Sequence, residues 1–140
     1  MFARVADRYL ADTITWAEAT ASSPDGQNTM ALAHLVMLSA SEPGSTLNKA
    51  RVELTFYAVR HPDLEAMVVD IGWQFYSRAK AVIAADAAAS TDPQILERQT
   101  LTALTFIDGV FNGFARNFHI FNNADELNVL LQGILRGIGN

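Results

Sequence analysis

Polar side chains that could do chemistry are few in this chain, and two of them lie within strongly apolar stretches. His34 lies in "NTMALAHLVMLSAS" (28–41), and Asp108 lies in "FIDGVF" (106–111). A histidine or carboxylate enclosed by apolar residues needs a hydrogen-bond partner, because burying an unpaired polar group is costly. Such side chains either bond to neighbouring groups inside the core or orient a mostly apolar ligand in a cavity. The sequence leaves both interpretations open.

The usual catalytic and cofactor motifs are absent from the sequence. It has no glycine-rich phosphate loop, no His-Glu-x-x-His and no Gly-x-Ser-x-Gly. The histidines at 34, 61 and 119 are far apart, and none stands three residues after a glutamate, as a di-iron site in a helical bundle requires. We therefore expect no enzyme, no metal and no cofactor, and a small helical enzyme remains the weakest alternative.

The composition indicates a soluble domain that hides part of its surface. Charged residues make up 18% of the chain and hydrophobic residues 50%, whereas soluble domains average roughly 25% charged residues. The net charge is −5 and the Lys and Arg residues are scattered, which argues against DNA binding by this chain. No cysteine, signal peptide or membrane-length apolar run is present, so we expect a cytoplasmic protein without a membrane partner.

The apolar residues recur at helical spacing, which predicts an all-α single domain over residues 1–140. Six helices are expected: one from Phe2 to the turn at 22–26, and others over 28–41, 46–61, 63–86, 93–118 and 123–138. The helix over 28–41 is apolar all round, which predicts burial on every side.

Capping residues predict where these helices begin. Pro62 disfavours helical geometry at His61 and suits the first position of the next helix. Asp92 precedes Pro93 and is a predicted N-cap. Asn123 with Glu126 three residues later resembles a capping box, and Ser45 or Thr46 is expected to cap the helix over 46–61.

A ligand cavity is expected between the first four helices and the early part of the fifth, because an all-apolar second helix must be enclosed by its neighbours. The ligand would be mostly apolar with one or two hydrogen-bonding groups. Asp70 and Gln74 are four residues apart and indicate a solvated helix face instead. The residues predicted to line the cavity are His34, Met37, Phe56, Trp73, Tyr76, Asp108 and Asn112.

The last two predicted helices carry more apolar residues than one core requires, together with two glycine pairs at i,i+4 spacing. Each mid-helix glycine costs about 0.5–1 kcal/mol relative to alanine, which indicates close approach between helices, although Gly137 could simply end the last helix. We expect a homodimer in which these two helices of each chain form a four-helix bundle. The predicted interface comprises Phe106, Gly109, Val110, Gly113, Phe114, Leu130, Gly133, Ile134 and Gly137.

Three stretches in this order resemble the C-terminal regulatory domain of TetR-type transcriptional regulators. They are "ARVELTFYAVRHPDLEAMV" (50–68), "DPQILERQTLTALTFIDGVFNGFA" (92–115) and "NNADELNVLLQGILRGI" (122–138). The most specific pieces are the helix break at 60–64 and the Ile-Asp-Gly of 107–109. The resemblance covers essentially the whole chain.

This resemblance implies an effector-sensing and dimerisation domain of a transcriptional repressor, with the cavity among the earlier helices and the dimer made by the last two. "MFARVADRYLAD" (1–12) resembles the start of the helix that follows the family's DNA-binding helix-turn-helix. We therefore expect that DNA-binding domain to be missing here, so no DNA-contacting residue carries over. The alternative is a helical oligomerisation module with a filled core and no ligand.

Overall fold

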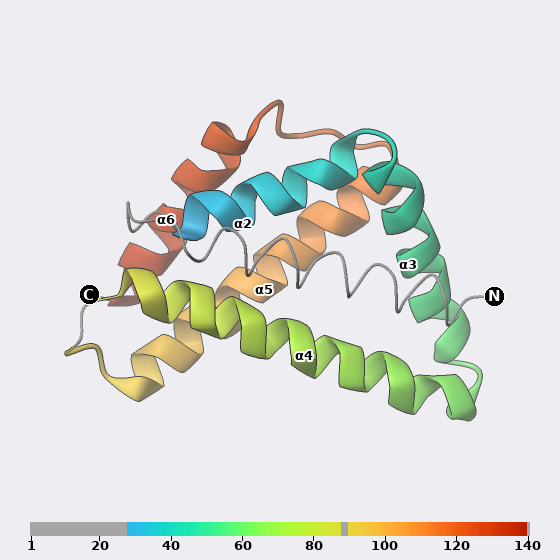
Figure 1. The fold of residues 1–140 in the computed structure, drawn as a ribbon, viewed down its shortest axis with the longest axis horizontal. Helices are drawn as coiled ribbons and strands as arrows, with labels where there is room; N and C mark the ends of the chain where they lie inside the picture. Colours follow the sequence, from blue (N-terminus) through green and yellow to red (C-terminus); the bar gives the residue numbers. More distant parts are fainter. Residues whose placement is uncertain (1–27, 88–89, 140) are drawn as a thin grey trace.

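The computed structural model describes residues 28–87 and 90–139, and this part of the chain is helical with no strand (Figure 1). The elements, in chain order, are α2 (Asn28–Met37), η1 (Leu38–Ala40, one turn of 3-10 helix), α3 (Gly44–Ala58), α4 (Pro62–Asp86), α5 (Pro93–Ala115) and α6 (Ala124–Gly139). The all-α prediction is confirmed for the described residues. The helix predicted from Phe2 lies outside them.

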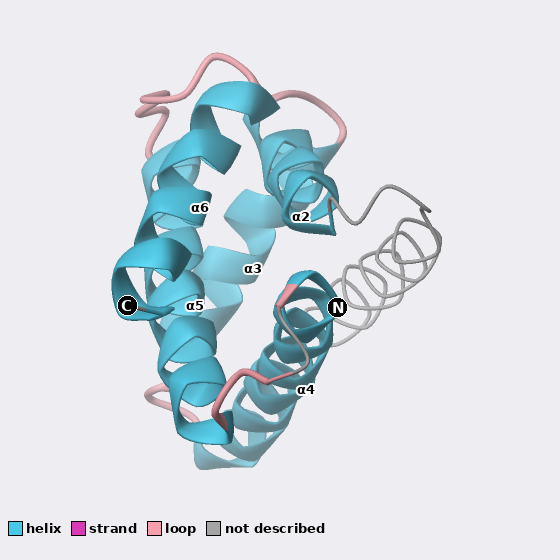
Figure 2. Ribbon diagram, turned by 90° about the vertical axis from the view of Figure 1, so that its left-hand side faces the viewer, coloured by secondary structure: helices cyan, strands magenta, loops and turns pink. Residues whose placement is uncertain are grey.

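The five described α-helices pack as two layers. Figure 2 shows α5 and α6 on one side of the molecule and α2 and α4 on the other, with α3 behind them. Contacts between helices follow this arrangement, since α2 packs on α6 and α4, and α4 packs on α5. Gln99, near the start of α5, donates a hydrogen bond to the carbonyl of Leu135, near the end of α6. The α5 and α6 helices are therefore antiparallel neighbours.

The break between α3 and α4 lies where the sequence predicts it. His61 has extended backbone angles, φ −135° and ψ 93°, and Pro62 takes the first position of α4. The imidazole of His61 stacks on the ring of Tyr57 with the centroids 3.8 Å apart, and its Nδ1 donates to the Tyr57 carbonyl at 2.8 Å. The break is thus held by local contacts as well as by the proline.

The starts of α5 and α6 also agree with the predicted caps. The Asp92 carboxylate accepts a hydrogen bond from the amide of Gln94 at 2.8 Å. The side-chain oxygen of Asn123 accepts from the amide of Glu126 at 3.0 Å, and the Glu126 carboxylate accepts from the amide of Asn122 at 2.9 Å. Both caps satisfy amides that the first helical turn leaves unpaired.

The start of α3 differs from the prediction. The helix begins at Gly44 without a side-chain cap, and the hydroxyl of Thr46 bonds to the Glu42 carboxylate at 2.6 Å instead of capping the helix. A Cβ on Gly44 would overlap the backbone carbonyl of Leu38. The close approach of α3 to η1, a tertiary contact, therefore sets this helix end.

Helix α5 ends at Ala115, three residues before the predicted end at 118. Asn117 adopts a left-handed conformation with φ 62°. The amide of Asn117 bonds to the Phe114 carbonyl at 2.9 Å, and the amide of Phe118 bonds to the Gly113 carbonyl at 2.8 Å. This pattern is the Schellman motif, in which asparagine is tolerated because its short polar side chain suits the left-handed region.

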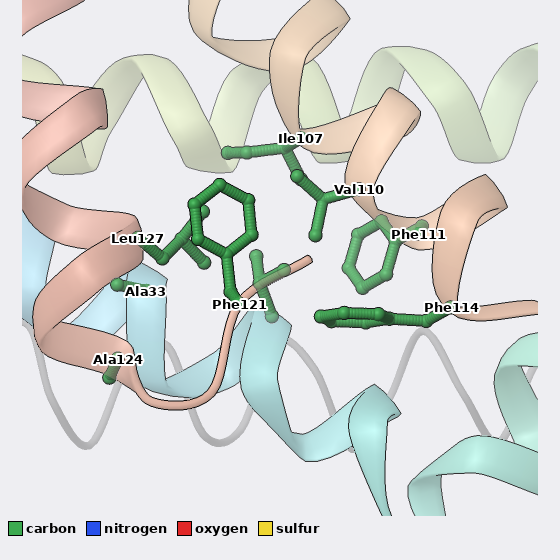
Figure 3. Packing of buried hydrophobic residues seen from close by; sticks show 9 residues of the cluster. Ala33, Ile107, Val110, Phe111, Phe114, Phe121, Ala124 and Leu127 are labelled. Carbon is green, nitrogen blue, oxygen red and sulfur yellow. The ribbon is translucent and has the colours of Figure 1, made fainter. Parts of the chain in front are cut away.

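The main core lies between α2, α5, α6 and the loop before α6, where Figure 3 shows side chains of all four segments pointing toward one another. Its buried residues are Ala33, Val36, Ile107, Val110, Phe111, Phe114, Phe121, Ala124 and Leu127. A second cluster of Ile83, Ala103 and Leu131 joins α4 to α5 and α6. The prediction that the second helix is buried on every side is wrong, because His34 is exposed on α2 and Leu38 on the following turn.

Within residues 28–87 and 90–139, no helix has both the length and the apolar character needed to cross a membrane.

Candidate functional site

The residues predicted to line a ligand cavity do not converge in the described structure. Phe56 on α3 and Trp73 on α4 are 62% and 61% exposed, and His34 on α2 and Asp108 on α5 are also exposed. The other three, which are Met37, Tyr76 and Asn112, are half-buried on α2, α4 and α5. Four different helices thus each present one member of this set to solvent.

Asp108 requires a specific correction, because we expected it to be enclosed by the apolar residues around it. The helix turns about 100° per residue, so Ile107, Val110 and Phe111 face the core while Asp108 and its neighbour Gly109 face outward. The Asp108 carboxylate is therefore exposed, because it lies on the outward side of α5.

The polar side chains on this outward side of α5 bond to their own helix. Asn112 donates to the carbonyl of Asp108 at 2.8 Å, and Thr105 donates to the carbonyl of Leu101 at 2.8 Å. Side chains of Asp70 and Gln74 on α4 likewise bond to each other at 2.8 Å on an exposed surface, as predicted. These polar groups form local helix contacts, and among them Gln74 also borders the hollow beside α4.

A hollow of about 390 Å³ opens beside α4. This volume lies within the range of roughly 300–1,000 Å³ that is usual for ligand pockets. Among the residues predicted to contact a ligand, only Trp73 lines the hollow, and its ring meets that of Tyr76 edge-on at 5.4 Å. The described lining residues are Trp73, Gln74, Ser77, Arg78 and Ala81.

Sequence reasoning missed four of these lining residues, although a signal for them was present. Positions 73, 74, 77, 78 and 81 follow the spacing of one side of a helix. The opposite side of α4, which carries Leu64, Ile71, Phe75 and Val82, is more apolar, so the hydrophobic pattern indicates that side as the functional and packed one. Lining residues of a surface hollow carry no such apolar signal.

Two of the three histidines stack on aromatic rings. His61 stacks on Tyr57, and His119 stacks on Phe114 with the centroids 5.3 Å apart. Within residues 28–87 and 90–139, no group of three or more His, Asp or Glu side chains is placed to hold a metal ion. The described part of the chain therefore offers no built metal centre.

The outward sides of α5 and α6 form the second candidate site. We call this surface the α5–α6 face. Its apolar members Leu101 and Leu130 are 47% and 50% exposed. It comprises Leu101, Thr105, Asp108, Gly109, Leu130, Gly133, Ile134 and Gly137, of which Ile134 is half-buried and the others are exposed.

Three glycines on this face are not needed by the packing of the chain itself. A Cβ at Gly109, Gly133 or Gly137 would meet no other group within 4 Å. Each of them nevertheless costs about 0.5–1 kcal/mol relative to alanine inside a helix. The glycines leave shallow, backbone-lined surface on α5 and α6 that a second surface could approach closely.

Four residues predicted for the dimer interface do not belong to this face. Val110 and Phe114 are core residues, 3% and 1% exposed. Gly113 is buried, and a Cβ there would lie 3.4 Å from the carbonyl oxygen of Phe118. Phe106 is half-buried and meets Phe121 edge-on at 6.1 Å. Contacts with α2, α6 and the loop between α5 and α6 thus occupy these four positions.

The chain was compared with protein-family models, with curated proteins and with solved structures, and none of the three comparisons found a match. The functional argument therefore depends on the α5–α6 face and on the hollow beside α4.

Proposed function

We propose that this chain is a dimerisation and ligand-sensing domain of a transcriptional repressor, of the kind that the TetR-type resemblance implies. In this proposal the α5–α6 face joins two copies of the chain, and the hollow beside α4 receives a small ligand. DNA would be contacted only through a separate DNA-binding domain. Neither role is catalytic.

The observation that carries the proposal is the set of three glycines on the α5–α6 face whose open side faces away from the chain's own core. Three such glycines gathered on the outward sides of two neighbouring helices favour a contact outside the chain, whereas a single one, such as Gly72 on α4, does not. A second copy suits this surface, because a two-fold axis pairs the same patch with itself. Leu101 and Leu130 would then be buried against the partner, where the glycines let the backbones approach.

The ligand-sensing part of the proposal is supported by the chemistry of the hollow. Trp73 offers a large apolar surface, while Gln74, Ser77 and Arg78 offer hydrogen-bonding groups. This combination suits a small, mostly apolar ligand with a polar end. The site differs from the enclosed cavity that the sequence predicted, because it lies on the outer side of α4.

A dimerisation module without a ligand is the second candidate, because it would use the same α5–α6 face. The two proposals differ only in whether the hollow beside α4 binds a ligand. Binding of a small ligand that Trp73 fluorescence detects would favour the sensing domain. Failure of a broad set of apolar ligands to bind, together with a stable dimer, would favour the module.

The oligomeric state of the unmodified chain tests the shared part of both candidates. We expect a dimer at micromolar concentration that buries at least about 1,200 Å² in total, the lower bound for stable interfaces. Analytical ultracentrifugation over a concentration series measures its dissociation constant. A single monomeric species at micromolar concentration would contradict the proposal.

A further inference from the structure

The last residue of α4 caps a helix far from it in the sequence. The carboxylate of Asp86 accepts hydrogen bonds from the amide of Asn28 at 3.1 Å, from the Asn28 side chain at 2.9 Å and from the amide of Thr29 at 2.8 Å. Amides in the first turn of a helix lack partners within that helix, and the helix dipole favours a negative charge near them. The end of α4 is therefore bonded to the start of α2.

The same start of α2 is bonded to α6. Thr29 is 2% exposed, and its hydroxyl accepts a hydrogen bond from the side chain of Gln132 at 3.3 Å. Gln132 directly precedes Gly133 of the α5–α6 face. A continuous polar chain, which we call the Asp86–Thr29–Gln132 chain, thus joins α4, α2 and α6.

Apolar contacts run alongside this polar chain. Ile83, one turn before Asp86, and Leu131, next to Gln132, belong to the same buried cluster and are 2% and 1% exposed. The hydrogen bonds of the polar chain are partly buried. Together with the close-packed side chains beside them they resist small displacements, since either a bond or a packing contact must be lost. A shift of the end of α4 would therefore disturb its contacts with α2 and α6.

The hollow lies on the same continuous helix as Asp86. Its lining residue Ala81 precedes Asp86 by five positions, and Ser77 and Arg78 precede it by about two turns. An α-helix transmits a displacement along its axis because its backbone bonds join every turn to the next. A ligand that moves this part of α4 would thus move the carboxylate that caps α2.

We propose that the Asp86–Thr29–Gln132 chain couples the hollow beside α4 to the α5–α6 face, so that the position of the end of α4 sets the strength of dimerisation. This inference rests on the proposed function, because it assigns a regulatory link between its two sites. Coupling of this kind changes an equilibrium constant by a factor of about 5 to 150 in typical cases.

The test measures the dimer dissociation constant of full-length variants by analytical ultracentrifugation. Asp86→Ala and Gln132→Leu should each raise it by about fivefold or more. The double variant should raise it by less than the product of the two effects, because both changes break one chain. Glu65→Ala is the matched control, since Glu65 is an exposed carboxylate on the same helix and is not among the described residues that line the hollow. Unchanged dissociation constants, or effects that multiply fully, would overturn the proposal.

Two further measurements keep the outcome decisive. If Asp86→Ala does not fold, Thr29→Val removes the middle hydroxyl with little change in shape and takes its place. If the unmodified chain proves monomeric, the proposed dimer fails, and hydrogen exchange of the α6 amides then decides the coupling. Faster exchange in α6 for Asp86→Ala but not for Glu65→Ala would support a link between the helices, and equal exchange would refute it.

Discussion

The side-chain amide of Asn48 donates a 2.8 Å hydrogen bond to the backbone carbonyl of Phe111, and Asn48 is fully buried. The guanidinium of Arg51 donates a hydrogen bond to the side-chain oxygen of Asn48 at 3.3 Å. The same guanidinium lies 5.0 Å from the centroid of the Phe111 ring. This cluster ties α3 to the C-terminal half of α5. It is one of the few polar contacts that hold α3 in place.

Replacing Asn48 with alanine should lower the free energy of unfolding by about 1–3 kcal/mol, because the variant loses a buried hydrogen bond and leaves the Phe111 carbonyl with fewer partners. Urea denaturation followed by circular dichroism measures the change. Asn112→Ala is the control, since Asn112 also donates to a backbone carbonyl, but within its own helix. We expect that control to stay within about 0.5 kcal/mol of the unmodified chain. Equal losses for both variants would contradict the role of Asn48.

Gly133→Leu should raise the dimer dissociation constant at least about tenfold, which corresponds to about 1.4 kcal/mol, because a bulky side chain would separate the two copies at the α5–α6 face. Analytical ultracentrifugation measures this change, while circular dichroism checks that helix content is kept. Gly72→Leu is the matched control: Gly72 is also an exposed mid-helix glycine with open space around its Cβ position, but it lies on α4. A comparable weakening by Gly72→Leu would argue against the face.

Gly44→Ala should destabilise the chain by about 1–3 kcal/mol, the range typical of overpacking. The added Cβ would overlap the carbonyl of Leu38, so the start of α3 or the η1 turn must move. Gly72→Ala should instead raise the free energy of unfolding by up to about 1 kcal/mol. Its Cβ would meet no other group within 4 Å, and alanine favours the helix. Thermal and urea denaturation of both variants give the comparison. A neutral Gly44→Ala variant would show that α3 can shift without cost.

An apolar fluorescent probe such as anilinonaphthalene sulfonate should bind beside α4 and change the emission of Trp73. Ala81→Trp should reduce its affinity at least about tenfold, which corresponds to about 1.4 kcal/mol, because the indole would fill much of the hollow of about 390 Å³. Titrations are performed with Trp16→Phe as background, so that Trp73 is the sole tryptophan before Ala81 is changed. Ala66→Trp, on α4 but outside the hollow, is the control. Equal binding to both variants would place the probe elsewhere.

The chain alone should show no specific affinity for DNA. Its net charge of −5 repels the phosphate backbone, which supplies most of the affinity of DNA-binding proteins. Fluorescence anisotropy with labelled duplexes at physiological salt measures this. Sub-micromolar binding to any duplex would refute the expectation and would remove the need for a separate DNA-binding domain.

The sequence by itself determined the helix content and several helix ends, because these depend on residues close together in the chain. Pro62 and His61 divide α3 from α4, Asp92 caps α5, and Asn123 caps α6 through contacts that span four residues or fewer. Local chemistry of this kind does not change with the way the helices pack.

The tertiary structure alone decided which sides of α5 and α6 are outward, because both helices carry apolar residues on more than one side. The packing of α2 and α6 against α5 placed Val110 and Phe114 in the core and left Gly109 and Gly133 exposed. Five of the nine predicted interface residues lie on the exposed face, and the other four are packed within the chain itself.

Contacts between residues distant in sequence could not be predicted from the sequence either. Asp86 caps α2 across 57 and 58 positions of the chain, and Asn48 reaches Phe111 across 63. A carboxylate at a helix end and an asparagine within a helix have many potential partners, and no local pattern selects one. Only the packing of the helices brings the particular amides and carbonyl within hydrogen-bonding distance, and the same packing places the hollow on the outer side of α4.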